Sequence, residues 1–144
     1  MVIVVVFGPS GAGKTQYCRK AFRAHEVVSP DRWRVKGAPY RHDGTKNPIA
    51  RCYAEAHRRL ATRPRRVVID IAATYAPHLD RWQRLAGEHG AALEWVGLTT
   101  ATWETLTRNV HSTPPEKLRW MWESMEETLE TWDRPGRLEV IVTG

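Results

Sequence analysis

The sequence predicts an α/β fold, a parallel sheet of about five strands with helices on both faces. Short apolar runs alternate with longer amphipathic segments along the 144 residues, which is typical of parallel strands joined by helical crossovers. The first run, residues 2–7, is rich in β-branched residues and leads directly into a glycine-rich turn. The length is that of one domain. We therefore predict a single domain over 1–144.

The glycine-rich turn carries the most specific motif in the chain. Residues 8–15 read Gly-Pro-Ser-Gly-Ala-Gly-Lys-Thr and match G-x-x-x-x-G-K-[ST] between a buried strand and a helix. Glycines let the backbone turn tightly and direct its N–H groups at a phosphate beside the helix N-terminus. In this pattern Lys14 reaches the β- and γ-phosphates, and Thr15 ligates Mg²⁺. The predicted nucleotide-binding residues of this loop are Gly8, Ser10, Gly11, Ala12, Gly13, Lys14 and Thr15.

The next elements follow from apolar spacing and turn signals. A helix is expected over 14–24 and a short strand over 26–29. Ser29-Pro-Asp-Arg32 has the form of a helix start, with Ser29 as cap and proline in the first turn. The segment 36–48 is rich in Gly, Pro, His and charge, so we expect a loop over the substrate side.

The second half continues the alternation of strands and helices. The expected helices are 48–63, 78–89, 102–109 and 116–132, and the expected strands are 65–70, 92–98 and 138–142. Residues from about 102 to 119 are two helical segments around a proline-containing turn. We expect them to form a lid that brings Arg108 over the phosphates and excludes water.

Two carboxylates are expected beside the phosphate loop. Asp31 follows the second strand, at the sheet edge where open parallel sheets bind ligands. Asp70 ends a buried strand, which places its carboxylate near the metal or the reacting group. Arg51, Arg58 and Arg59 can form a phosphate-facing edge on their helix, although a solvated face is the commoner arrangement.

Charge and composition restrict the partners. Lys and Arg total 22 against 16 Asp and Glu, which gives a net charge of +6 and favours a polyanion, nucleic acid first among them. The two cysteines lack metal-ligand spacing, and the run 2–7 is too short to span a bilayer. We expect a cytoplasmic protein without a membrane partner. Most of the seven tryptophans are expected to pack in the core or on the surface rather than to stack on bases.

Taken together, these motifs resemble the P-loop domain of bacteriophage-type polynucleotide 5′-kinases and related small kinases. The shared stretches are GPSGAGKT, PDRWR at 30–34, VVID at 67–70, the helix at 78–89, LTRN at 106–109 and LRWM at 118–121. In that family an Asp is followed three residues later by an Arg just after the second strand, and Asp31 and Arg34 fit this pattern. The resemblance implies a P-loop kinase fold with a helical lid, and ATP and Mg²⁺ as cofactors.

The resemblance also implies roles for five residues besides Thr15. Asp31 would accept the proton of the attacking hydroxyl, and Arg34 would hold the acceptor phosphate. Asp70 would orient Arg34 or the acceptor. Lys14 and Arg108 would contact the nucleotide phosphates and stabilise the transferred charge.

The resemblance predicts transfer of the γ-phosphoryl group of ATP to a nucleic-acid hydroxyl, first the 5′-OH end of DNA or RNA. Two departures leave the acceptor open. The Thr-Asn that commonly follows the strand acid is replaced by Ile71-Ala-Ala73, and His111-Ser-Thr-Pro114 stands where a second lid arginine is often found. Alternative acceptors are a hydroxymethylated pyrimidine (5-hydroxymethyluridine) within phage DNA, or a nucleoside or other small molecule. A nucleotide-dependent binding switch is a further hypothesis, but it would not need Asp31.

Overall fold

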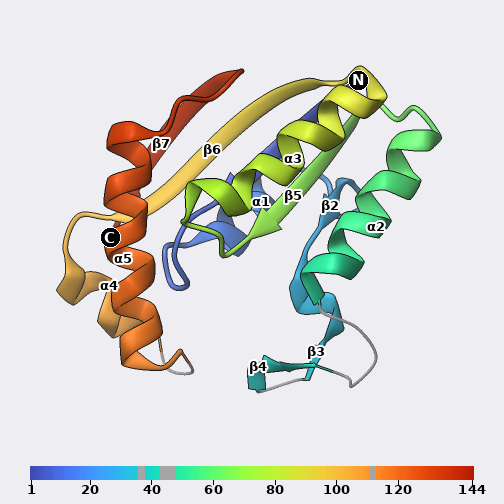
Figure 1. Cartoon of the computed structure of the whole chain (residues 1–144). Coiled ribbons are helices and arrows are strands. Elements are labelled where there is room, and N and C mark those ends of the chain that lie inside the picture. The colour runs from blue at the N-terminus through green and yellow to red at the C-terminus, as the bar shows by residue number, and fades with distance from the viewer. Residues whose placement is uncertain (36–37, 43–47, 111–112) are drawn as a thin grey trace.

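A computed structural model describes residues 1–35, 38–42, 48–110 and 113–144, and of 34–35 and 38–42 it describes the backbone only. Five strands form one parallel sheet in the order β2-β5-β1-β6-β7 (Figure 1). Their bounds are β1 Val2–Phe7, β2 Val27–Val28, β5 Arg66–Ile71, β6 Ala92–Thr100 and β7 Arg137–Thr143. The predicted α/β fold class is confirmed.

The central strand β1 explains why the opening run is continuously apolar. β1 lies between β5 and β6, so Val4 is paired with Val68 on one side and with Glu94 on the other. Successive side chains point to opposite faces of the sheet, and residues 3–7 are all buried. A strand that is covered on both faces needs apolar residues at consecutive positions, as parallel sheets generally do.

Helices cover both faces of the sheet, as expected. α2 (Pro48–Ala61), α3 (Ala76–His89) and α5 (Pro115–Thr131) lie on one face, and α1 (Lys14–Ala21) lies behind the sheet in Figure 1. Leu60, Trp82 and Met125 bring α2, α3 and α5 into one apolar core with Ile3. Cys18 of α1 belongs to a second core on the opposite face. α4 (Trp103–Asn109) contacts β6.

Two expectations are wrong. The backbone of the expected loop 36–48 contains strand β4 (Ala38–His42), which pairs with β3 (Arg34–Val35) as an antiparallel ribbon with an irregular register. Composition does not reveal this pairing, because it depends on contacts between segments. The helix expected over 14–24 ends at Ala21, because Phe22 becomes extended and packs against Tyr17 and the Arg66 guanidinium.

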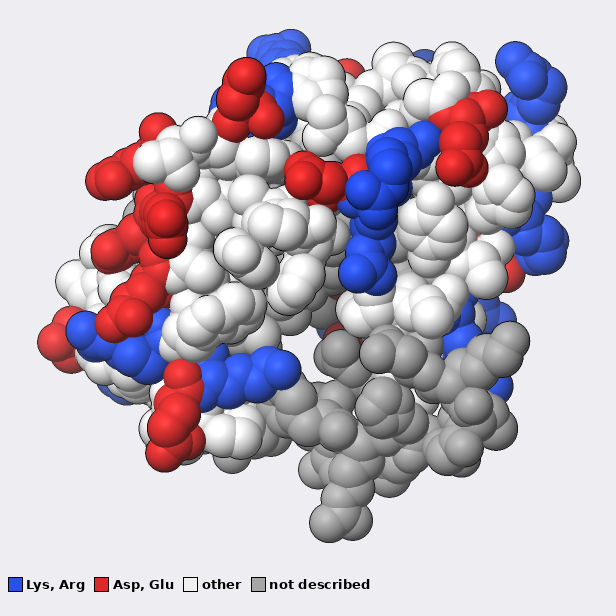
Figure 2. Space-filling view, in the orientation of Figure 1, with Lys and Arg blue, Asp and Glu red and all other residues white. Residues whose placement is uncertain are grey.

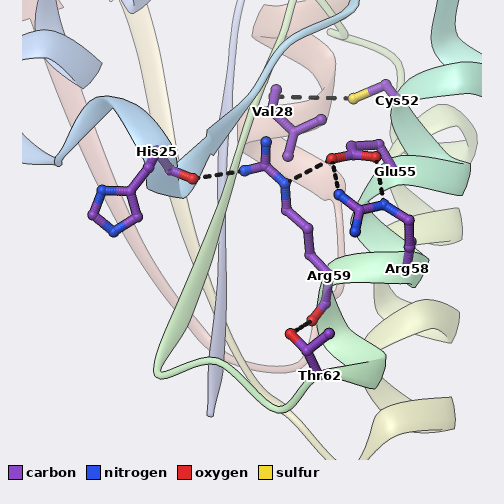
Figure 3. Close-up of polar contacts among 7 residues, drawn as sticks. All are labelled: His25, Val28, Cys52, Glu55, Arg58, Arg59 and Thr62. Carbon is purple, nitrogen blue, oxygen red and sulfur yellow. Dashed lines mark hydrogen bonds and ion pairs between the residues drawn. The ribbon is translucent and has the colours of Figure 1, made fainter.

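Polar contacts of α2 fix the segment that leads to Asp31 (Figure 3). Glu55 accepts hydrogen bonds from Arg58 at 2.6 Å and from Arg59 at 3.0 Å. Arg59 also donates to the carbonyl of His25 at 2.8 Å, in the 3-10 helix η1 (Ala24–Glu26) that precedes β2. Arg59 therefore fastens α2 to η1, just before β2, whereas Arg58 pairs with Glu55 within α2. Neither guanidinium is directed at the cavity by these contacts. Among the described residues, no helix is long and apolar enough to cross a membrane.

Candidate active site

The carboxyl ends of the parallel strands meet along one edge of the sheet, and a cavity of about 870 Å³ lies along this edge. Its walls come from the phosphate loop, from the segment after β2, from the ends of β5 and β7, and from the end of α4. Eight of the residues predicted from the sequence line it: Ser10, Gly11, Gly13, Lys14, Thr15, Asp31, Asp70 and Arg108. Segments far apart in the chain thus meet at the predicted site.

The glycines of the loop have conformations that other residues rarely adopt. Gly8, Gly11 and Gly13 have φ values of 147°, 84° and 92°. A Cβ atom on Gly8 would lie 2.0 Å from the carbonyl oxygen of Leu98, and one on Gly11 would lie 2.4 Å from a methyl group of Val110. Gly8 therefore packs the loop against β6 instead of lining the cavity. Glycine is required at both positions for the loop to lie where it does.

The N-terminus of α1 opens into the cavity. Gly13 caps this helix in a left-handed conformation, and the first turn contains no acidic residue. Free N–H groups and the helix dipole favour an anion at such a position. The Lys14 side chain is buried and donates to the carbonyl of Pro9 at 3.0 Å. The Ala12 side chain points from the loop into the core and is fully buried, so it does not reach a ligand.

Two carboxylates and a hydroxyl converge beside Lys14. The Thr15 hydroxyl donates to Asp70 at 3.5 Å, and Asp70 is only 6 % exposed. Burial raises the pKa of Asp70, the carboxylate of Asp31 raises it further, and Lys14 opposes the rise. Asp31 and Asp70 therefore lie close enough to repel each other, at a place that a cation would stabilise.

These oxygens fit Mg²⁺. Carboxylate and hydroxyl oxygens are the ligands that this hard cation prefers, and it is commonly held by one or two carboxylates together with substrate phosphates. In the part of the chain that the structure describes, no group of three or more His, Cys, Asp or Glu side chains could form a cage for a metal ion. Thr15 and Asp70 are the residues placed to contribute to such a site.

Asp31 and Arg34 are the two residues that the sequence predicts to contact the acceptor. Asp31 lies in the 3-10 helix η2 (Pro30–Trp33), where its N–H donates to the Ser29 hydroxyl at 3.4 Å. Its side chain is exposed at the cavity. Arg34 begins β3, and its side chain lies outside the described part of the chain. The role expected of Arg34 stays a prediction.

The expected lid region contacts the phosphate loop directly. Arg108 is exposed on α4, lines the cavity and donates to the Thr105 hydroxyl at 3.3 Å. The amide of Asn109 donates to the carbonyl of Gly11 at 3.2 Å. The end of α4 therefore rests on the loop. His111 and Ser112, which follow, lie outside the described residues.

Sequence reasoning missed two residues that hold the loop from outside. One is Asn109, which appeared only as the last residue of a shared motif. The other is Thr143 at the end of β7, whose hydroxyl donates to the carbonyl of Ala12 at 2.9 Å and lies 3.2 Å from that of Thr99. Thr143 could have been predicted to lie near the site, because in a parallel sheet the end of the last strand lies at the ligand-binding edge.

The fold is shared with three solved kinase structures. A sugar kinase from a Janibacter species aligns with a TM-score of 0.61 and 20% identity, over 99% of this chain and 85% of that one. A gluconokinase from Sinorhizobium meliloti gives 0.59 and 19%, over 96% and 81%. The APS kinase of Mycobacterium tuberculosis, in complex with AMPPNP and APS, gives 0.52 and 17%, over 96% and 87%. These likenesses show a P-loop kinase fold and do not single out the polynucleotide kinases.

Sequence comparison shows the family. No curated protein matches the chain significantly. A family model described as an AAA domain matches residues 3–130, which include the phosphate loop, Asp31, Asp70 and the α4 segment. The chain therefore belongs to the AAA domain family.

Proposed function

We propose that the protein is a kinase that transfers the γ-phosphoryl group of ATP to a hydroxyl group of an acceptor. The observation that carries this proposal is the position of Asp31, which lies in the same cavity as the phosphate loop and Asp70. A protein that only hydrolysed a nucleotide as a switch would not need a second, exposed carboxylate beside the loop. A kinase needs such a group to accept the proton of the acceptor hydroxyl.

The reaction follows from the charges around the cavity. The acceptor oxygen forms a bond to the γ-phosphorus, its proton passes to Asp31, and the bond to the β-phosphate oxygen breaks to release ADP. Lys14, the N-terminus of α1 and Arg108 are the positive groups that compensate the charge on the phosphates. Thr15 and Asp70 would hold Mg²⁺, which would supply positive charge to neutralise part of the phosphate charge.

The comparisons favour a small-molecule acceptor over the nucleic-acid end that the sequence placed first. The three solved structures are described as a sugar kinase, a gluconokinase and an APS kinase, and each name refers to a small molecule. The 5′-OH end of DNA or RNA is our second candidate. It is supported by the net charge of +6, which attracts polyanions.

Transfer of label from γ-labelled ATP with Mg²⁺ tests the proposal. The acceptor panel contains sugars, gluconate, nucleosides, DNA and RNA with 5′-OH ends, and duplex DNA with blocked ends that bears 5-hydroxymethyluridine. We expect label on one class, and at least a hundredfold loss of transfer in Asp31→Asn, with nucleotide binding retained because Asp31 does not belong to the loop. Equal transfer by Asp31→Asn and the wild type would refute the assignment of Asp31.

A further inference from the structure

Three aromatic side chains, Tyr75, His78 and Trp120, form an exposed group that we call the aromatic cluster. The ring centroids of Tyr75 and His78 lie 5.1 Å apart, those of Tyr75 and Trp120 5.9 Å, and those of His78 and Trp120 6.2 Å. Tyr75 and Trp120 are each 45% exposed. The Tyr75 ring packs edge to face with both His78 and Trp120, and the cluster leaves ring surface open to a ligand.

This exposure sets Trp120 apart from the other tryptophans. Trp82 and Trp95 are fully buried, and the remaining four are partly buried. The expectation that tryptophans serve packing therefore holds for six of the seven. Among the described residues, four large hydrophobic side chains are exposed, and two of them belong to the aromatic cluster. Exposed large aromatics that lie together are more typical of a binding surface than isolated exposed residues are.

Buried hydrogen bonds hold the cluster in place. The hydroxyls of Thr74 and Ser124 lie 2.6 Å apart, and the Thr128 hydroxyl donates to the carbonyl of Thr74 at 2.7 Å. All three residues are buried. These contacts fasten the segment after β5, which carries Tyr75, to α5, which carries Trp120. The rings are therefore preorganised, which reduces the entropic cost of binding a ligand.

Residues close to the cluster in the chain reach the cavity. Tyr75 lies three positions after cavity-lining Ala72, on the connection from β5 to α3. Met121, next to Trp120, accepts a hydrogen bond from cavity-lining Ser10 at 3.9 Å. In Figure 1, α5 and the start of α3 lie on the same face of the sheet, and Figure 2 shows a hollow in the described part of this face between α5 and α2.

We propose that the aromatic cluster binds a nucleobase, so that the acceptor is a nucleoside unit whose sugar carries the reacting hydroxyl. This inference rests on the proposed kinase function. Any of the bases can stack on aromatic rings such as those of Tyr75 and Trp120, because each base has a planar face. The His78 ring can hydrogen-bond to the edge of a base. A free nucleoside and the terminal unit of a nucleic acid share this chemistry. A sugar or a sugar acid offers no planar base to the cluster.

The test compares variants of Trp120 in steady-state transfer assays with nucleosides and with 5′-OH oligonucleotides as acceptors. Loss of stacking in Trp120→Leu should raise the acceptor KM about tenfold, with kcat and the KM for ATP within about twofold of the wild type. Trp120→Phe keeps an aromatic ring and should restore most of the affinity. Trp122→Leu is the matched control, because two positions along a helix point to nearly opposite sides, and it should leave the acceptor KM unchanged.

Other outcomes separate the two proposals. Transfer to sugars or gluconate that Trp120→Leu does not affect would leave the kinase standing and overturn the base-binding site. An equal loss in Trp120→Leu and Trp120→Phe would also overturn it. If no acceptor is labelled, the kinase proposal fails. Equilibrium dialysis with labelled adenosine and thymidine then tests whether the aromatic cluster binds a base. Binding of either that Trp120→Leu weakens supports the site, and no binding refutes it.

Discussion

Replacing Thr143 by valine tests whether β7 positions the phosphate loop. Valine has nearly the shape of threonine but no hydroxyl, so the substitution removes the donor to Ala12 and keeps the packing. The N–H and C=O groups on either side of a trans peptide point in opposite directions. Holding the Ala12 carbonyl toward Thr143 therefore holds the Gly13 N–H on the other side of the loop, where we expect it to face a phosphate.

The expected magnitude follows from one hydrogen bond. The Thr143 hydroxyl has one hydrogen and two carbonyl partners, Ala12 at 2.9 Å and Thr99 at 3.2 Å, so at most one full bond is lost. A neutral hydrogen bond contributes about 1 kcal/mol net, which corresponds to about a fivefold change in an equilibrium constant. We expect the Kd of a nonhydrolysable ATP analogue to rise about fivefold in Thr143→Val.

Calorimetric titration with the ATP analogue and with adenosine measures this effect. Only the analogue carries phosphates, so its affinity should fall while that of adenosine changes little. Thr143→Ser keeps the hydroxyl and should bind the analogue like the wild type. The reasoning is refuted if a folded Thr143→Val binds the analogue as tightly as the wild type. It also fails if serine weakens binding as much as valine.

Two further predictions concern stability. In Gly8→Ala the new Cβ would lie 2.0 Å from a backbone oxygen, at a φ of 147°, so we expect the free energy of unfolding to fall by about 2 kcal/mol or more. Gly87→Ala is the control, because it adds a Cβ in open space within a helix, and the free energy of unfolding should rise by roughly 0.5 to 1 kcal/mol. Thermal melts measure both, and equal melting temperatures would contradict the loop geometry. The two hydrogen bonds from Arg66, and next the one from the Arg23 N–H, lower the pKa of Glu26 from 4.5 to about 2. This depressed pKa stabilises the fold above pH 4.5, and the contribution is lost as the pH falls toward 2. Glu26→Gln should therefore cost roughly 1 kcal/mol at pH 7, after allowance for solvent screening, and much less near pH 2 in urea titrations. A difference from the wild type that persisted near pH 2 would show that the pair acts by packing.

The sequence was informative wherever structure depends on neighbouring residues. Residues 2–15 contain the buried strand, the glycine turn and the helix start in one continuous stretch, and all three form as predicted. The alternation of apolar runs and amphipathic segments was enough to predict a parallel sheet, because a strand covered on both faces needs apolar neighbours. Asp70 lies near the end of such a strand and lines the cavity, and its role there stays a prediction.

The sequence was uninformative where a contact joins distant segments. The bond from Thr143 to Ala12 spans 131 positions, and that from Asn109 to Gly11 spans 98. Neither residue type marks its partner, because threonine and asparagine have many surface roles. The meeting of Tyr75 with Trp120 is a contact of the same kind.

This division explains why the donor was predicted more sharply than the acceptor. The phosphate-binding half of the cavity comes mainly from one continuous motif whose glycines, lysine and threonine each have a fixed role. The acceptor half that we propose would be assembled from η2, from the segment after β5 and from α5, which are far apart in the chain. Proteins that share this fold can therefore keep the same donor chemistry and change the acceptor through these segments. If the aromatic cluster binds a base, the acceptor specificity of this protein depends on Tyr75 and Trp120, which lie outside the phosphate-binding motif.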